Sequence, residues 1–131
     1  MRYPEYELQC QVSSYLSFQY PDVDFMSDTI ASVRLTMPQA RRNKKVQKHG
    51  FKCPDLLIFE PRGKYHGLFI ELKAKTPYKK CGNELKKNQH NQEQYKQLKK
   101  FEKKGYRATF AWSFEMARSI IDDYMKKEKN Y

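Results

Sequence analysis

Residues Cys53 to Lys75 read CPDLLIFEPRGKYHGLFIELKAK, and this stretch decides the fold. It contains two short apolar runs, Leu56 to Phe59 and Leu68 to Leu72, with the turn-forming Pro61-Arg62-Gly63 between them. Short apolar runs that break at Pro and Gly and then resume are typical of β-strands. The stretch therefore predicts two adjacent antiparallel strands.

The second run contains a charged pair, Glu71 and Lys73, on either side of Leu72. Residues two apart in a strand point to the same face, so both charged side chains project together. Burying a carboxylate and an ammonium in an apolar strand is costly unless they serve each other or a ligand. We therefore treat this pair as the first candidate for chemistry.

The N-terminal part predicts one helix and two short strands. The helix spans Glu5 to Gln19, with Leu8, Val12, Tyr15 and Leu16 on one stripe at helical spacing. Glu5 falls on that same stripe, three and seven residues before Leu8 and Val12, whereas Glu7 lies to its side. Weak patterns at Asp24–Asp28 and Ser32–Leu35 are each compatible with a short strand.

A basic segment precedes the organising stretch. It carries six cations in twelve residues with no acid between them: Arg41, Arg42, Lys44, Lys45, Lys48 and Lys52. Pro38 is a suitable start for a short helix, and Gly50 is a suitable stop. The segment is interpreted as a phosphate-binding arm, an interpretation compatible with a flexible solvated loop.

The C-terminal half predicts a loop, a helix, a strand and a last helix. The loop covers Thr76 to Asn83, and the helix runs from about Glu84 to Lys104 and ends at Gly105. Its apolar stripe is Tyr95, Leu98 and Phe101. Gln94 shares the inward face, where an amide needs a hydrogen-bonding partner. A strand at Tyr106–Trp112 and an amphipathic helix at Phe114–Lys127 follow, the latter with Met116, Ala117, Ile120, Ile121 and Tyr124 facing inward.

This order of elements predicts an α/β fold bordering on α+β, in which a small mixed sheet is flanked by helices. The helix between the last two strands suggests a parallel pairing there. A chain of 131 residues is long enough for one domain, so we expect a single domain over residues 1–131.

The composition indicates which class of molecule the protein binds. The net charge is +11 at pH 7, and Lys73 to Lys104 holds eleven lysines against three acids, which favours nucleic acid. No apolar run reaches the roughly 18 residues of a membrane span, and no signal peptide is visible. Three scattered cysteines, Cys10, Cys53 and Cys81, indicate a reduced cytoplasmic protein. No glycine-rich phosphate loop is present, so we expect no nucleotide cofactor.

Asp55 starts one predicted strand, and Glu71 lies inside its neighbour, so the two carboxylates can converge across the ladder. Converging carboxylates repel unless a cation lies between them, and oxygen ligands suit Mg²⁺ or Mn²⁺. Lys73 would lie at the edge of that site. It could orient or deprotonate a water, or stabilise charge that builds on a phosphate.

Pro54-Asp55 followed by Glu71-Leu72-Lys73 resembles the PD-(D/E)xK nuclease signature. The wider text, GFKCPDLLIFEP, YHGLFIELKAKTPYKK and HNQEQYKQLKKFEKKGYRATF, resembles the VRR-NUC branch of that superfamily and its small stand-alone phage or prophage members. The resemblance covers roughly residues 1 to 125. It implies a restriction-endonuclease-like core.

The resemblance also implies roles for single residues. Asp55 and Glu71 would be metal ligands together with the Leu72 carbonyl, Lys73 would be the catalytic lysine, and Gln94 would orient the site. A glutamate on the first helix would reach the metal directly or through water, with Glu5 the better match and Glu7 the second choice. Arg41, Arg42, Lys44, Lys45, Lys48 and Lys75 are expected to contact nucleic acid.

The sequence thus predicts a Mg²⁺- or Mn²⁺-dependent DNA endonuclease. Resemblance to single-domain members implies a homodimer that acts on branched DNA such as a Holliday junction. The main alternative is a non-catalytic nucleic-acid-binding module that retains the fold. A basic RNA-associated protein is a third interpretation, which leaves the buried Glu71 and Lys73 without a purpose.

Overall fold

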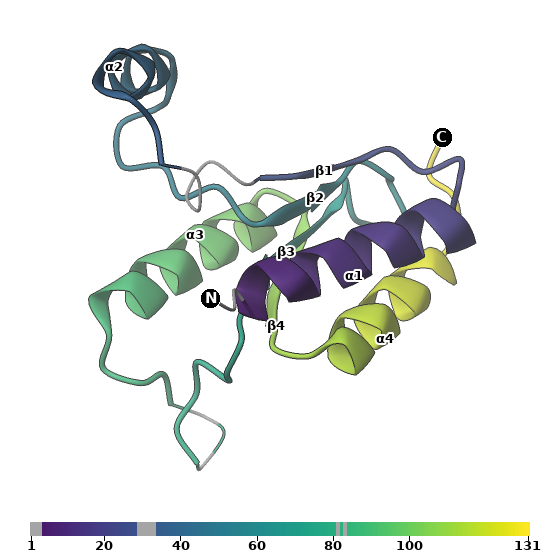
Figure 1. Cartoon of the computed structure of the whole chain (residues 1–131). Helices are drawn as coiled ribbons and strands as arrows, with labels where there is room; N and C mark the ends of the chain where they lie inside the picture. The colour runs from purple at the N-terminus through teal and green to yellow at the C-terminus, as the bar shows by residue number, and fades with distance from the viewer. Residues whose placement is uncertain (1–3, 29–33, 81, 83) are drawn as a thin grey trace.

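The computed structural model describes residues 4–28, 34–80, 82 and 84–131. These residues form four helices and four strands, in the order α1-β1-α2-β2-β3-α3-β4-α4 (Figure 1). Their bounds are α1 Pro4–Gln19, β1 Phe25–Ser27, α2 Met37–Val46, β2 Leu56–Ile58, β3 Leu68–Leu72, α3 Gln89–Lys103, β4 Arg107–Ala111 and α4 Phe114–Met125.

The four strands form one mixed sheet in the order β1-β2-β3-β4. The β1–β2 and β2–β3 pairs are antiparallel, and the β3–β4 pair is parallel. The predicted antiparallel pairing of β2 with β3 and the predicted parallel pairing of β3 with β4 are therefore confirmed. In the β2–β3 register Leu56 lies opposite Ile70. All five residues of β3 are buried, as expected for a central strand that is covered on both faces.

Helices cover the two faces of the sheet and create two apolar cores (Figure 1). Helices α1 and α4 pack on the face that carries Leu68, Ile70 and Leu72. Helix α3 packs on the opposite face, where Phe69 contacts Phe101 with ring centroids 4.8 Å apart. Because side chains alternate along β3, Glu71 belongs to the α3 face. The predicted α/β architecture is confirmed.

Two predicted helix boundaries are wrong. Helix α3 begins at Gln89 instead of Glu84, because Leu85 and Lys86 pair with an earlier part of the loop: Lys86 N–H donates to the Pro77 carbonyl at 2.8 Å, and Tyr78 forms a β-bridge with Leu85. The loop therefore extends to Asn88, whose side chain caps α3. Helix α2 ends at Val46 instead of near Gly50, because Gln47 is already extended, with φ −92° and ψ 145°.

The weak strand patterns are confirmed only in part. The first is a real but shorter strand, β1, which pairs with β2. Of the second, Ser32–Leu35, residues Ser32 and Val33 lie outside the described residues, and Arg34 and Leu35 are not in a strand. Within the described ranges, none of the helices combines the length and apolar character that a membrane span requires.

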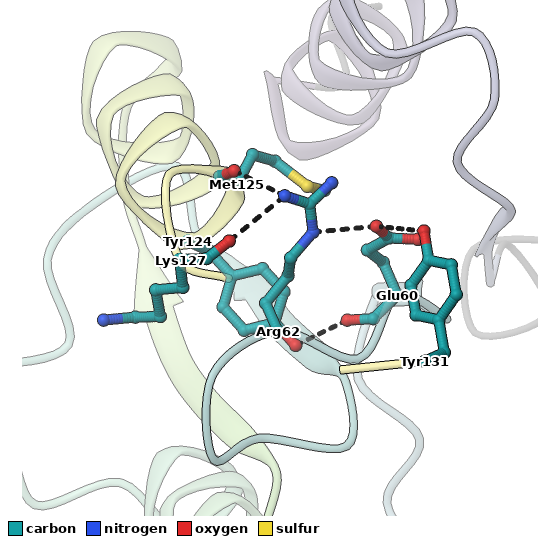
Figure 2. A network of polar contacts seen from close by, with 6 residues as sticks. All are labelled: Glu60, Arg62, Tyr124, Met125, Lys127 and Tyr131. Atoms are coloured by element: carbon teal, nitrogen blue, oxygen red, sulfur yellow. Dashed lines mark hydrogen bonds and ion pairs between the residues drawn. The ribbon is translucent and has the colours of Figure 1, made fainter. Parts of the chain in front are cut away.

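A polar network ties the end of β2 to the end of α4 (Figure 2). Arg62 Nε donates to Glu60 Oε2 at 2.8 Å, and the Tyr131 hydroxyl donates to the same oxygen at 3.0 Å. Arg62 Nη1 also donates to the Met125 carbonyl at 2.8 Å. The Tyr124 hydroxyl donates to the Glu60 carbonyl at 2.6 Å. The network lies at the end of the sheet where β2 ends and β3 starts.

Candidate active site

Two carboxyl groups meet at the opposite end of the sheet, where β2 starts and β3 ends. Asp55 directly precedes Leu56, and continuing the β2–β3 register places it opposite Glu71. The two side chains are hydrogen-bonded to each other. The Leu72 N–H donates to Asp55 Oδ2 at 2.8 Å, so the backbone of β3 fixes the Asp55 carboxyl from the other side.

Burial and mutual repulsion disfavour two negative charges here. Burial raises the pKa of Glu71 to about 10, and the hydrogen bond and charge of Asp55 add to the shift. Burial also raises the pKa of Asp55, although the hydrogen bonds from Glu71 and from Leu72 N–H oppose that rise. Burial and the neighbouring carboxyl therefore both favour a proton on the pair.

Lys73 adds a positive charge beside the pair. It follows β3 by one residue and is half-buried, and its charge lowers the pKa of both Asp55 and Glu71. The Lys73 N–H donates to the Ala111 carbonyl at 2.9 Å, which fixes the backbone at this point. The structure thus brings Asp55, Glu71 and Lys73 together as the sequence predicted.

Gln94 lies at the same level of the fold. Helix α3 runs antiparallel to β3, because it connects two parallel strands. Starting from the Phe69–Phe101 contact, Gln94 lies about 10 Å back along α3. Glu71 lies about 7 Å forward along β3 from the same contact. This places Gln94 near the end of β3, between the levels of Glu71 and Lys73.

The Gln94 side chain is oriented inward, as its spacing predicted. The residue is 7% exposed, and its Oε1 is buried without a hydrogen-bond partner among the residues that the structure describes. A buried carbonyl oxygen without a donor costs about 1–3 kcal/mol. Such an atom at the level of an acidic pair is typical of a position that a bound water, ion or substrate completes.

Glu5 is the acid on α1 that reaches the pair. Its charge raises the pKa of both Asp55 and Glu71, and its Oε1 accepts a hydrogen bond from Ala74 N–H at 3.4 Å. Glu7 is exposed and contributes to neither shift. Of the two acids that the sequence left open, the geometry therefore favours Glu5.

Two residues that the sequence interpretation did not single out support the site. Gln9 is 8% exposed, and its Nε2 donates to the Asp28 carbonyl at 2.9 Å and to the Asp55 carbonyl at 3.2 Å. The Asp28 N–H also donates to the Asp55 carbonyl, at 2.8 Å. Gln9 lies one helical turn after Glu5, on the apolar stripe of α1. A polar side chain on that stripe was the feature of the sequence that could have identified Gln9 as part of the site. Nothing in the weak pattern around Asp28 indicated its position.

The six cations predicted to contact nucleic acid lie on two separate segments of the chain. All six cations are exposed: Arg41, Arg42, Lys44, Lys45, Lys48 and Lys75. The first four belong to α2, which stands off from the sheet on the side where α1 begins (Figure 1). Lys75 lies in the segment that follows β3, three residues after Leu72.

The donor set fits a hard divalent cation. Two carboxyl groups that otherwise share a proton, with a backbone carbonyl adjacent at Leu72, form an all-oxygen set of the kind that Mg²⁺ and Mn²⁺ accept. Among the described residues, no three His, Cys, Asp or Glu side chains cluster as a metal-binding group. Glu5 therefore adds charge near the pair without forming a third clustered carboxylate.

The whole chain resembles a solved structure described as a "VRR_NUC domain protein". The two share 24% sequence identity with a TM-score of 0.62, and the match covers 98% of this chain and 93% of the other. No family model matches the sequence, and no curated protein matches it. The structural likeness confirms the fold that the sequence resemblance implied.

Proposed function

We propose that this protein is a divalent-metal-dependent DNA endonuclease that hydrolyses phosphodiester bonds. The observation that carries the proposal is the pairing of the buried Glu71 with the half-buried Asp55, whose carboxyl also accepts from Leu72 N–H, with Lys73 beside them. A pair of carboxyls that must share a proton when alone gains most from a cation between them. The basic surface around the pair favours a polyanionic substrate.

Each residue has a role that its position supports. Asp55 and Glu71, with the Leu72 carbonyl, would hold Mg²⁺ or Mn²⁺, and Glu5 would contribute through water. The metal, when bound, activates a water and neutralises charge on the phosphate. Lys73 would orient or deprotonate that water, or stabilise the charge that develops on phosphate oxygens. Gln94 would direct its unpaired Oε1 to the water and hold it in line.

Selectivity for branched DNA and a homodimeric assembly belong to the same proposal. Helix α2 is cationic and stands off from the sheet (Figure 1), and Lys75, Lys79 and Lys80 follow β3. Two separate basic surfaces suit a substrate with more than one duplex arm. A dimer would supply two sites for two strands.

A panel of labelled branched, flapped and linear DNA tests the proposal in Mg²⁺ and in EDTA. We expect metal-dependent cleavage by the wild-type protein. The Glu71→Gln variant should lose at least about 100-fold in rate while binding DNA with similar affinity. Intact cleavage by that variant would exclude this site. Glu7→Gln is the matched control, because Glu7 is an exposed acid two residues from Glu5, and its rate should be unchanged.

The panel also distinguishes the alternative. A non-catalytic nucleic-acid-binding module would bind the same DNA without products in Mg²⁺ or Mn²⁺. Light scattering together with a strand-specific label tests the dimer. A monomer that nicks one strand at a time would contradict paired cleavage.

A further inference from the structure

Helix α2 is an insertion that the sheet does not require. Strands β1 and β2 are an antiparallel pair, and antiparallel neighbours usually connect through two to five residues. Here residues 28–55, a connection of 28 residues, separate them. A connection of this length that contains its own helix calls for a function outside the core.

The helix is stabilised locally instead of by the core. Thr36 and Gln39 form a capping box, with Thr36 N–H donating to Gln39 Oε1 at 2.9 Å and Gln39 N–H donating to Thr36 Oγ1 at 3.3 Å. None of its ten residues is buried. Phe51 fixes the chain that returns from α2 by packing on Phe101 of α3, with ring centroids 6.1 Å apart. Helix α2 therefore projects from the body of the protein, and Phe51 anchors the chain that follows it.

The charge of α2 is one-sided and uncompensated. Arg41, Lys44 and Lys45 share one face at helical spacing, and Arg42 lies at its flank. The opposite face carries Asn43, the one residue of α2 that is half-buried. None of the ion pairs that the structure describes involves these four cations, and residues 29–54 contain no acid.

Shape and composition indicate a B-form DNA duplex as the partner. A free helix is about 10–12 Å wide with its side chains, which matches the major groove of about 12 Å. The major groove of an RNA duplex is too narrow for it. Single strands are bound through aromatic stacking, and α2 has no aromatic residue.

The reach of α2 sets the length of that duplex. Asp55 follows Val46 by nine residues, so their separation is at most about 32 Å. DNA rises about 3.4 Å per base pair, so this reach corresponds to roughly ten base pairs. We propose that α2 grips the major groove of double-stranded DNA within about one helical turn of the cleaved bond. This inference rests on the proposed function and adds the substrate class: a double-stranded arm, gripped at up to about ten base pairs from the cleaved bond.

Binding measurements with two charge-matched variants test the inference. The α2 variant is Arg41→Gln, Arg42→Gln, Lys44→Gln and Lys45→Gln. The control is Lys103→Gln, Lys104→Gln, Lys126→Gln and Lys129→Gln, which removes the same charge at the end of the sheet opposite the carboxyl pair. Gln has a helix propensity close to that of Lys and Arg, and circular dichroism checks that both variants fold.

Fluorescence anisotropy in EDTA would follow binding to duplexes of about 6, 10, 14 and 20 base pairs between about 50 and 200 mM salt. On the longer duplexes we expect the α2 variant to bind at least about 10-fold more weakly than the control. Its slope of log affinity against log salt should fall by about 0.9 for each phosphate group that is no longer neutralised. On the shortest duplex, on single-stranded DNA and on an RNA duplex, the two variants should differ little.

Three outcomes would overturn the inference. The control could lose as much affinity for long duplexes as the α2 variant does. The α2 variant could lose as much on single strands or RNA duplex as on long DNA. It could also change its elution volume in size-exclusion chromatography, which would assign α2 to contact with a second copy. Because the assay contains no metal, a protein that binds as expected but never cleaves would contradict only the proposed function.

Discussion

At the scale of single residues, the burial of Glu71 needs a functional reason. A carboxyl at 5% exposure in the central strand of a sheet is unfavourable for the fold by itself. The hydrogen bond to Asp55 offsets this cost only while one of the two groups is protonated. Glu71 therefore lowers the stability of the metal-free protein at the pH where the protein would act. Such a cost is common at functional positions.

The pH dependence of stability follows from that pKa. Glu71 has an ordinary pKa of 4.5 and a folded-state pKa of about 10. Its stabilising contribution is therefore fully present below pH 4.5 and is lost as the pH rises through 10. In EDTA, Glu71→Gln should become more stable relative to wild type as the pH rises from about 5 to about 9. Thermal unfolding across this pH range measures the difference in stability between Glu71→Gln and the wild type. A difference that does not change with pH would contradict the shared proton.

Gln9 offers a second test at this scale. Its amide satisfies the carbonyl groups of Asp28 and Asp55, so Gln9→Leu should cost about 1–3 kcal/mol in the free energy of unfolding. The variant should also lower kcat more than it raises KM, because the Asp55 backbone loses its support. Gln11→Leu, two residues on and exposed, is the control. Equal effects of both variants in denaturant titration and kinetics would contradict a positioning role.

At the scale of elements, most of the organisation was predictable from the sequence. Both strand pairings follow from the apolar runs around Pro61 and Gly63 and from the crossover helix. The position of Gln94 followed from its spacing to Leu98 and Phe101. The start of α3 was not predictable, because it depends on the pairing of Pro77 and Tyr78 with Leu85 and Lys86. The support that Gln9 gives to Asp55 also depends on tertiary contacts, since the two residues are 46 positions apart.

The N-terminal caps of α2 and α3 are expected to differ in what they contribute to global stability. Asn88 Oδ1 accepts from His90 N–H at 2.9 Å and from Asn91 N–H at 3.2 Å, and α3 packs on the core. Asn88→Ala should therefore cost about 1 kcal/mol in global stability. Thr36→Ala removes a similar cap from α2, which contributes no buried residue, and should leave global stability unchanged. Denaturant unfolding and amide exchange distinguish them, and an equal global loss would contradict a free-standing α2.

At the scale of the whole molecule, function and stability lie at opposite ends of the sheet. The carboxyl pair lies where β2 starts and β3 ends. The Glu60–Arg62 network lies at the other end and joins the C-terminal residues to the body (Figure 2). This network was not predictable from the sequence, because Glu60 and Arg62 form hydrogen bonds with residues that are 63 to 71 positions away along the chain. From the sequence alone, both charged side chains could equally have been exposed.

Because the Glu60–Arg62 network lies far from the carboxyl pair, disrupting the network should lower stability without lowering the cleavage rate. Arg62→Met leaves the buried Glu60 carboxylate without its cationic partner and should cost about 3–5 kcal/mol in the free energy of unfolding. Adding Glu60→Gln should recover part of that loss. Below the melting temperature, the cleavage rate should stay near that of the wild type. Lys64→Met, an exposed neighbour, is the control, and a rate that falls with Arg62→Met at a temperature where the variant is folded would contradict the separation.

Asp55 and Glu71 are proposed to form a divalent metal site. Isothermal titration calorimetry with Mg²⁺ and Mn²⁺ near pH 8 tests it most directly, in two buffers that differ in ionisation enthalpy. Because the pair shares a proton when metal-free, binding to the wild type should release about one proton per ion. Glu71→Gln should bind at least about 10-fold more weakly and release none. Absence of binding to the wild type, or equal binding by Glu71→Gln, would contradict the claim.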